Sequence, residues 1–283
     1  MQIDTSFLHE LDRFNLIVKK RVTSNYRGSR RSMAKGRGIV FSDHRIYVPG
    51  DDIRAIDWRV YGRTDDLFVK MYEEEMSLVV HILIDLSRSM DFGRPLSKAD
   101  YASMLGVGFA YLTMKENEKF QFSTFSDTLV TFKSKKGMHQ LASTITYLNK
   151  LKPDGITSFR DIMEQYKRYV HGKSLIILIS DFLSDIEEIR RGLVQFGKHD
   201  LKVIQVLDRV EKDLKFSGDM RLKDSESDQI LRTFVSPSLR SKYQHNLGAH
   251  TEQIEKACLN MGANFHQVTT DTPIFDSFYS VLE

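Results

Sequence analysis

Cysteine, proline and long apolar runs are scarce in this sequence, and each scarcity excludes a class of protein. The one cysteine, Cys258, cannot form a disulfide within the chain, which excludes a disulfide-stapled secreted framework. Five prolines and 16 glycines in 283 residues exclude collagen-like and linker-dominated chains. The longest apolar runs, at 78–84 and 175–179, are far shorter than the ~18 residues that a transmembrane helix needs.

The first residues also lack the features of a signal peptide. Acidic residues occur where a signal peptide carries a basic stretch followed by a hydrophobic run. We therefore expect a cytoplasmic protein that is peripheral at a membrane only through its partners.

The net charge is only +3, but basic residues are concentrated near the N-terminus. Between Arg13 and Ser42 there are nine Lys or Arg residues and no Asp or Glu. Such a stretch can bind nucleic acid, an anionic membrane surface or an acidic protein. The alternative, which we favour, is a solvated segment packed beside acidic surface.

The chain divides near residue 77 into two parts with different patterning. We expect residues 1–76 to form an N-terminal helix and a small β-subdomain, and residues 77–283 to form a larger domain with a C-terminal extension. In the first part, apolar residues at helical spacing predict a helix over 5–21. Short β-type pieces follow at 39–41, 45–48 and 67–70.

After residue 77, apolar runs of strand length alternate with helical patterns. The predicted strands lie at 79–84, 120–125, 129–132, 175–179, 201–207 and 264–268, with shorter β pieces near 220–223 and 230–235. The predicted helices lie at 97–115, 139–151, 159–170, 186–196 and 237–261, and a last helix ends the chain. This alternation predicts an α/β fold, with a mostly parallel sheet covered by helices on both faces.

Oxygen-bearing side chains follow the first buried strand, in Asp85-Leu86-Ser87-Arg88-Ser89. Ligands of open α/β sheets bind outside the carboxyl ends of the strands. Carboxylate and hydroxyl oxygens suit Mg²⁺ or Ca²⁺ and do not suit zinc or copper. Taken alone this short motif is weak, because such strings also form helix caps and turns.

Two further residues fall at matching places in the predicted topology. Thr157 lies in a loop that opens a helix, and Asp181 ends the buried strand after 175–179. With Asp85, Ser87 and Ser89, they resemble the metal-ion-dependent adhesion site (MIDAS) of the von Willebrand factor A fold. The resemblance implies hydroxyl ligands from Ser87, Ser89 and Thr157, directly or through water, and Asp85 and Asp181 acting mainly through water. The implied ion is Mg²⁺, or else Mn²⁺ or Ca²⁺, and a partner's carboxylate would complete its coordination.

Further segments resemble a bacterial family known as "domain of unknown function 58". They are Tyr47-Val-Pro-Gly50-Asp51-Asp52-Ile-Arg54-Ala-Ile-Asp57-Trp58-Arg59, Val69-Lys70-Met-Tyr72-Glu-Glu-Glu75, Asp85 to Gly93, Val206-Leu-Asp208-x-x-Glu211 and Leu222-Lys-Asp224-Ser-Glu226. Ile156 departs from the pattern, because a glycine is expected before the threonine. Since members of this family typically occur beside MoxR-type AAA+ ATPases, the resemblance implies a role as their adaptor or chaperone partner.

The segment 50–63 mixes acids and arginines around the only tryptophan. One hypothesis is a docking surface for a partner, since Trp and Arg often anchor interfaces. The other, which we favour, is a network of ion pairs that fixes the small subdomain, with Trp58 as a buried residue. The residues concerned are Asp51, Asp52, Arg54, Asp57, Trp58 and Arg59.

Motifs for catalysis are absent from the sequence. There is no P-loop, dinucleotide-binding glycine motif, H-E-x-x-H or G-x-S-x-G, and Cys258 is interpreted as a core residue. We therefore expect a non-enzymatic, metal-dependent protein-binding module. Two alternatives stay open: a polyanion binder that uses the basic stretch 13–37, and an Mg²⁺-dependent phosphoryl-processing enzyme that uses Asp85 and Asp181.

Overall fold

The computed structural model describes residues 7–8, 11, 40–73, 79–172, 174–214, 218–223 and 230–282. The chain forms two compact units: residues 17–77 make the smaller one, and residues 1–16 together with 78–283 make the larger one. Phe7, Leu8 and Leu11 are helical, and the side chains of Phe7 and Leu11 are buried. The rest of the helix predicted over 5–21, and the whole basic stretch from Arg13 to Arg37, lie outside the described residues.

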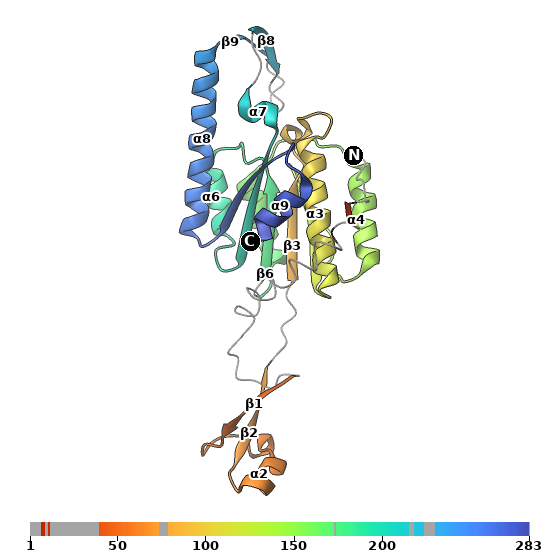
Figure 1. The fold of residues 1–283 in the computed structure, drawn as a ribbon, viewed down its shortest axis with the longest axis vertical. Helices are drawn as coiled ribbons and strands as arrows, with labels where there is room; N and C mark the ends of the chain where they lie inside the picture. Colours follow the sequence, from red (N-terminus) through yellow and green to blue (C-terminus); the bar gives the residue numbers. More distant parts are fainter. Residues whose placement is uncertain are drawn as a thin grey trace. The chain divides into compact units, whose positions relative to one another are not determined.

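In the smaller unit, an antiparallel pair of strands supports two short helical segments (Figure 1). β1 (Val40–Ile46) pairs with β2 (Phe68–Glu73), with a register shift between Phe41 and Asp43. The connecting segment holds a 3₁₀ turn, η1 (Ile53–Ala55), and the helix α2 (Trp58–Thr64). Ile56 forms a bridge to Val69, and both side chains are buried.

The larger unit is built on a six-stranded sheet with the order β10-β7-β6-β3-β4-β5. All neighbouring strands are parallel except β5, which is antiparallel to β4. The predicted α/β fold with a mostly parallel sheet is therefore confirmed. The strands are β3 (Val79–Asp85), β4 (Lys119–Phe125), β5 (Leu129–Thr131), β6 (Ser174–Ser180), β7 (Asp200–Leu207) and β10 (Asn264–Thr269).

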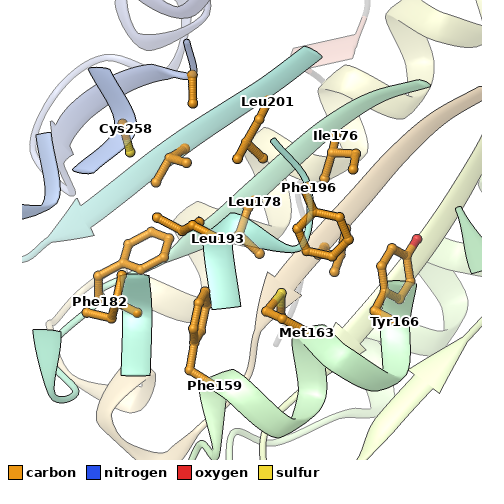
Figure 2. Close-up of a cluster of buried hydrophobic side chains, with 14 of the residues drawn as sticks. Phe159, Met163, Tyr166, Ile176, Leu178, Phe182, Leu193, Phe196, Leu201 and Cys258 are labelled. Carbon is orange, nitrogen blue, oxygen red and sulfur yellow. The ribbon is translucent and has the colours of Figure 1, made fainter. Parts of the chain in front are cut away.

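One face of this sheet is covered by three helices and a large apolar cluster (Figure 2). Alternate residues of β6, Ile176 and Leu178, point into this cluster and meet aromatic side chains such as Phe159 and Phe196. Cys258 is fully buried there, and burial raises the pKa of its thiol to about 12, so the predicted core role is confirmed. The helices are α5 (Phe159–Tyr166), α6 (Ile186–Val194) and α8 (Pro237–Asn260).

The opposite face packs against α3 (Lys98–Lys115), and α9 (Ile274–Leu282) contacts both α3 and β10. Ser97 and Asp100 form a reciprocal capping box that starts α3. Two glycines allow close approach on its surface. An added Cβ on Gly106 would overlap Ile84 of β3, and one on Gly108 would overlap the ring of Phe278 in α9.

The remaining elements connect the sheet and extend it. α4 (Met138–Lys150) precedes α5, and the 3₁₀ turns η2 (Arg88–Asp91) and η3 (Lys167–Tyr169) follow β3 and α5. After β7 come the short helix α7 (Arg209–Asp213) and a separate hairpin of β8 (Gly218–Lys223) and β9 (Ile230–Val235), which emerges beside α7 (Figure 1). Within the part of the chain that is described, no helix has both the length and the apolar character needed to cross a bilayer.

Candidate metal centre

The candidate site lies where the strand order of the sheet reverses. β4 and β5 continue the sheet on one side of β3, whereas β6, β7 and β10 continue it on the other. The loops that leave the carboxyl ends of β3 and β6 therefore diverge, which opens the crevice where parallel sheets bind ligands. Asp85 is the last residue of β3, and Asp181 follows the last residue of β6.

The Asp85 carboxylate is the centre of the hydrogen-bond network. Its Oδ1 accepts from the backbone N–H of Ser87 at 2.8 Å and from Oγ1 of Thr157 at 3.1 Å. Its Oδ2 accepts from Oγ of Ser180 at 2.7 Å. Asp85 is buried, and burial, with the nearby charge of Asp181 as a second cause, raises the pKa of its carboxyl group.

Backbone contacts bring the Thr157 loop to the Asp85 loop. The N–H of Asp154 donates to the carbonyl of Leu86 at 2.9 Å, and the N–H of Arg88 donates to the carbonyl of Gly155 at 3.0 Å. The Arg88 guanidinium also pairs with the Asp154 carboxylate at 3.0 Å. These three links join residues 66 to 68 positions apart in the sequence and hold Thr157 beside Asp85.

The hydroxyl groups of the predicted site converge on the same place. Oγ of Ser87 lies 3.1 Å from Oγ of Ser89, and Ser87 is buried. Hydrogen bonds thus join four of the residues singled out from the sequence. The Ser87 backbone and the Thr157 hydroxyl bind the Asp85 carboxylate directly, and Ser89 is joined to it through Ser87.

Asp181 is engaged by a cation of the chain itself. Its Oδ2 accepts from Nζ of Lys98 at 2.8 Å, and the same ammonium binds Glu211 of α7 at 2.9 Å. Lys98 is completely buried. Burial alone would lower the pKa of Lys98, but the charges of Asp181 and Glu211 outweigh it and raise that pKa.

Sequence reasoning did not identify Lys98 or Glu211 as part of the site. A signal was nevertheless present, because Lys98 is the first residue of α3, where the positive end of the helix dipole disfavours a cation. A lysine at the first position of a helix indicates that nearby carboxylates compensate for its unfavourable interaction with the helix dipole.

The buried charges of the site do not balance. Asp85, Asp181 and Glu211 supply three carboxylates and Lys98 only one ammonium, so the group carries two excess negative charges when all four are ionised. Uncompensated buried charge is costly. A divalent cation would remove the excess, and carboxylate and hydroxyl oxygens are donors that Mg²⁺, Mn²⁺ and Ca²⁺ accept. The residues present therefore fit such an ion.

In the part of the chain that the structure describes, the candidate site included, no group of three or more His, Cys, Asp or Glu residues is arranged to hold a metal. The candidate site differs from such clusters because it combines carboxylates with the hydroxyl groups of Ser87, Ser89 and Thr157.

The acids of the 50–63 segment are used within the smaller unit. Asp57 caps α2 and accepts from His44 at 3.0 Å, and this bond, with other contacts, lowers the pKa of its carboxyl to about 2. Asp51 binds Arg45 at 2.7 Å, and Asp52 caps η1 by accepting from the N–H of Arg54. The ion pairs at Asp57 and Asp51 thus join these acids to His44 and Arg45, which lie outside the segment, and not to the guanidinium groups of its own arginines.

The interpretation of Trp58 as a buried residue is wrong. Trp58 is 58% exposed and makes an edge-to-face contact with Tyr61, which is also exposed. Arg54 and Arg59 are exposed beside it. The helix α2 is only seven residues long, too short to bury both of its faces against a two-stranded sheet.

The strand order defines a doubly wound α/β protein with a mostly parallel six-stranded sheet, the fold that the resemblance to the von Willebrand factor A type predicted. Residues 43–253 match the family described as "Protein of unknown function DUF58", and because this is well over half of the chain, the protein belongs to that family. The uncharacterized protein Mb1516 of Mycobacterium bovis is 24% identical over 274 residues, which covers 95% of this chain and 86% of the relative.

Solved structures of low sequence identity resemble the fold. The conserved hypothetical protein BatB from Bacteroides thetaiotaomicron is 14% identical, with 72% of this chain and 97% of BatB covered and a TM-score of 0.45. The SpRpn10 VWA domain is 11% identical, with coverage of 72% and 94% and a TM-score of 0.44. Manganese-loaded TRAP protein of Plasmodium vivax is 16% identical, with coverage of 46% and 57% and a TM-score of 0.37. At these scores, the fold assignment rests on the strand order of this chain.

Proposed function

We propose that the protein is a non-enzymatic, divalent-metal-dependent protein-binding module. The observation that carries this proposal is the convergence of Asp85, Ser87, Ser89 and Thr157, from two loops far apart in the sequence, at the reversal point of the sheet. The excess negative charge of the site supports the same conclusion, because it calls for a cation.

The roles of the five predicted residues differ. Ser87, Ser89 and Thr157 would hold the ion through hydroxyl oxygens, and Asp85 would orient Ser87 and Thr157 through the bonds it already makes. Asp181 would act through water, because Lys98 occupies its Oδ2. When bound, the ion would present an open coordination position to an incoming carboxylate.

Lys98 favours a partner that supplies an acid. Because Lys98 binds Oδ2 of Asp181, that oxygen would not be a direct ligand of an ion at the site, which leaves a coordination position for another group. A carboxylate from another protein then becomes a strong ligand. This is the arrangement expected of a contact that forms through the metal and is lost with it.

A MoxR-type AAA+ ATPase, or a client of one, is the partner we propose. The support is the resemblance of the chain to its family, whose members typically occur beside such ATPases. Nucleic acid is a less favoured partner, because the centre of the site is negative. The enzyme alternative is also disfavoured, because Asp85-Leu86-Ser87 lacks the second aspartate that an aspartyl-phosphate phosphatase needs.

The proposal is tested by measuring association of the full chain with the MoxR-type ATPase of the same genome in Mg²⁺ and in EDTA. We expect binding to be lost in EDTA and in Asp85→Ala, and to survive moderate salt and neutralisation of Arg27, Arg30 and Arg31. Binding that tolerates EDTA but is lost with the arginines and with added salt would instead establish the polyanion or acidic-protein alternative.

A further inference from the structure

Large apolar side chains face solvent on each of the four segments that surround the candidate metal centre. One follows β3 and η2, one lies in the loop before α5, one follows β6, and one is in α7 after β7. They are Phe92, Ile156, Leu183 and Val210, with exposed fractions of 43%, 52%, 39% and 37%. We call these four residues the apolar rim.

Two members of the rim contact the buried charges of the site directly. The ring of Phe92 lies with its centroid 5.9 Å from Nζ of Lys98, the ammonium that binds Asp181. The N–H of Leu183 donates to Oδ1 of Asp181 at 3.4 Å. The ring of Phe92 and the backbone of Leu183 thus lie close to the Lys98–Asp181 pair.

The other two members are neighbours of site residues in the chain. Ile156 precedes Thr157, whose hydroxyl binds Asp85, at the position where the family resemblance implies a glycine. Val210 precedes Glu211, which binds Lys98, and its N–H donates to the Asp208 carboxylate at 2.8 Å. Each member of the rim is therefore in contact with a site residue or next to one in the chain.

The rim residues are exposed although the segments that carry them also contribute apolar side chains to the core. The same segments place other apolar residues inside: Leu86 and Met90 after β3, and Phe182 directly before Leu183, are all buried. Exposed apolar residues on the segments of one site mark it as a candidate interaction surface, where they can add apolar contacts to a polar one.

We propose that the partner presents one Asp or Glu flanked on both sides by aliphatic or aromatic residues. The acid would reach the metal centre, and its apolar neighbours would pack on the rim. This inference rests on the proposed function and adds to it, because the metal centre alone would accept any accessible carboxylate. A nucleic-acid phosphate would leave the rim without apolar contacts.

A phage-displayed library of random dodecapeptides tests the proposal. The library is bound to the immobilised full chain in Mn²⁺, and phage are eluted with EDTA and sequenced. We expect the eluted peptides to be enriched in Asp or Glu, with Leu, Ile, Val or Phe enriched at the positions on either side of the acid.

Variants separate the rim from the metal centre. Leu183→Ser and Ile156→Ser are expected to retain enrichment of the acid and to lose the apolar preference beside it. Leu259→Ser is the matched control, since Leu259 is 67% exposed near the end of α8. That end of α8 leads into the amino end of β10, whereas the site lies at the carboxyl ends of the strands. Leu259→Ser should select the same peptides as the unaltered chain. Equal melting temperatures would show that each variant is folded.

Two outcomes contradict different claims. Acidic peptides without apolar flanks, or apolar flanks that persist in Leu183→Ser and Ile156→Ser, would overturn the rim and leave the metal-dependent function intact. No acid enrichment in the EDTA eluate, or the same enrichment from Asp85→Ala, would overturn the proposed function itself.

Discussion

At the scale of single residues, Lys98 is the side chain on which the charge balance of the site depends. It is completely buried and binds two carboxylates, Asp181 and Glu211, at 2.8 and 2.9 Å. Removing one partner from a buried ion pair leaves the other charges uncompensated and typically costs about 3–5 kcal/mol. The stability of the metal-free protein should therefore depend strongly on this lysine.

We predict that Lys98→Met destabilises the protein by about 3 kcal/mol in EDTA, measured by urea unfolding, because Asp181 and Glu211 lose their cation. Mg²⁺ should restore part of this loss. Lys256→Met is the control, since Lys256 pairs with Glu252 on the surface of α8 and such pairs contribute about 0–1 kcal/mol. Equal effects of the two substitutions would contradict the assigned role of Lys98.

His81 gives the fold a pH dependence that does not involve the metal centre. It is buried in β3, its Nδ1 is 2.8 Å from the Tyr166 hydroxyl, and its Nε2 has no partner. Burial, together with the charges of His199 and His171, lowers the pKa of His81 to about 4. In the unfolded chain this histidine has its ordinary pKa of 6.5, so the unfolded chain binds a proton at higher pH than the folded chain does.

Stability from this effect is present above pH 6.5 and is lost as the pH falls toward 4. At pH 5.0 the loss amounts to about 2 kcal/mol. We predict that the decrease in unfolding free energy between pH 7.5 and pH 5.0 is smaller by about that amount in His81→Gln than in the unaltered chain. The contribution of His266, whose pKa is also lowered to about 4, remains in both proteins. Parallel pH profiles would show that His81 does not titrate as described.

At the scale of secondary-structure elements, α3 depends on glycines for its close contacts on both sides. Gly108 faces the ring of Phe278 in α9, which is fully buried. Helix propensity alone would make alanine more favourable than glycine by up to about 1 kcal/mol. The packing of α9 reverses that preference.

We predict that Gly108→Ala lowers the unfolding free energy by about 1–3 kcal/mol, because the new methyl group overpacks the contact with Phe278. Combining it with Phe278→Leu should recover part of the loss, which a double-mutant cycle measures. Gly248→Ala is the control: Gly248 lies in the interior of α8, nothing stands within 4 Å of an added Cβ, and a small gain in stability is expected. A loss at Gly248 as large as that at Gly108 would contradict the packing argument.

Strands and helices of the larger unit were largely predictable, because their apolar periodicity is a local property. Residues 175–179 form an uninterrupted apolar run and residues 79–84 a run interrupted only by His81, and both segments are central strands covered on two faces. The short α7 was not predicted, since five residues carry too little periodicity to indicate a helix. The exposure of Trp58 could not be predicted from the sequence either, because it depends on how much surface the rest of the small unit offers for the side chain to pack against.

At the scale of the whole molecule, the strand order brings residues from short, separate motifs together into one site. Asp85, Ser87, Ser89 and Thr157 could be predicted because each stands at a strand end or a helix start in the sequence. The pairing of Asp181 with Lys98 could not, because it joins residues 83 positions apart through the packing of α3 beside β6. Local patterns thus identify ligands more readily than the charges that surround them.

The most direct test of the account is a calorimetric titration of the metal-free full chain with Mn²⁺. We predict one binding site, which Asp85→Ala abolishes and which Thr157→Val weakens by about 10- to 100-fold, because the hydroxyl that binds Asp85 is removed. Ser143→Ala is the matched control, since Ser143 donates only to a carbonyl on the exposed surface of α4, and it should bind as the unaltered chain does. Undiminished Mn²⁺ binding by Asp85→Ala, or no binding by the unaltered chain, would contradict the metal centre and the function proposed from it.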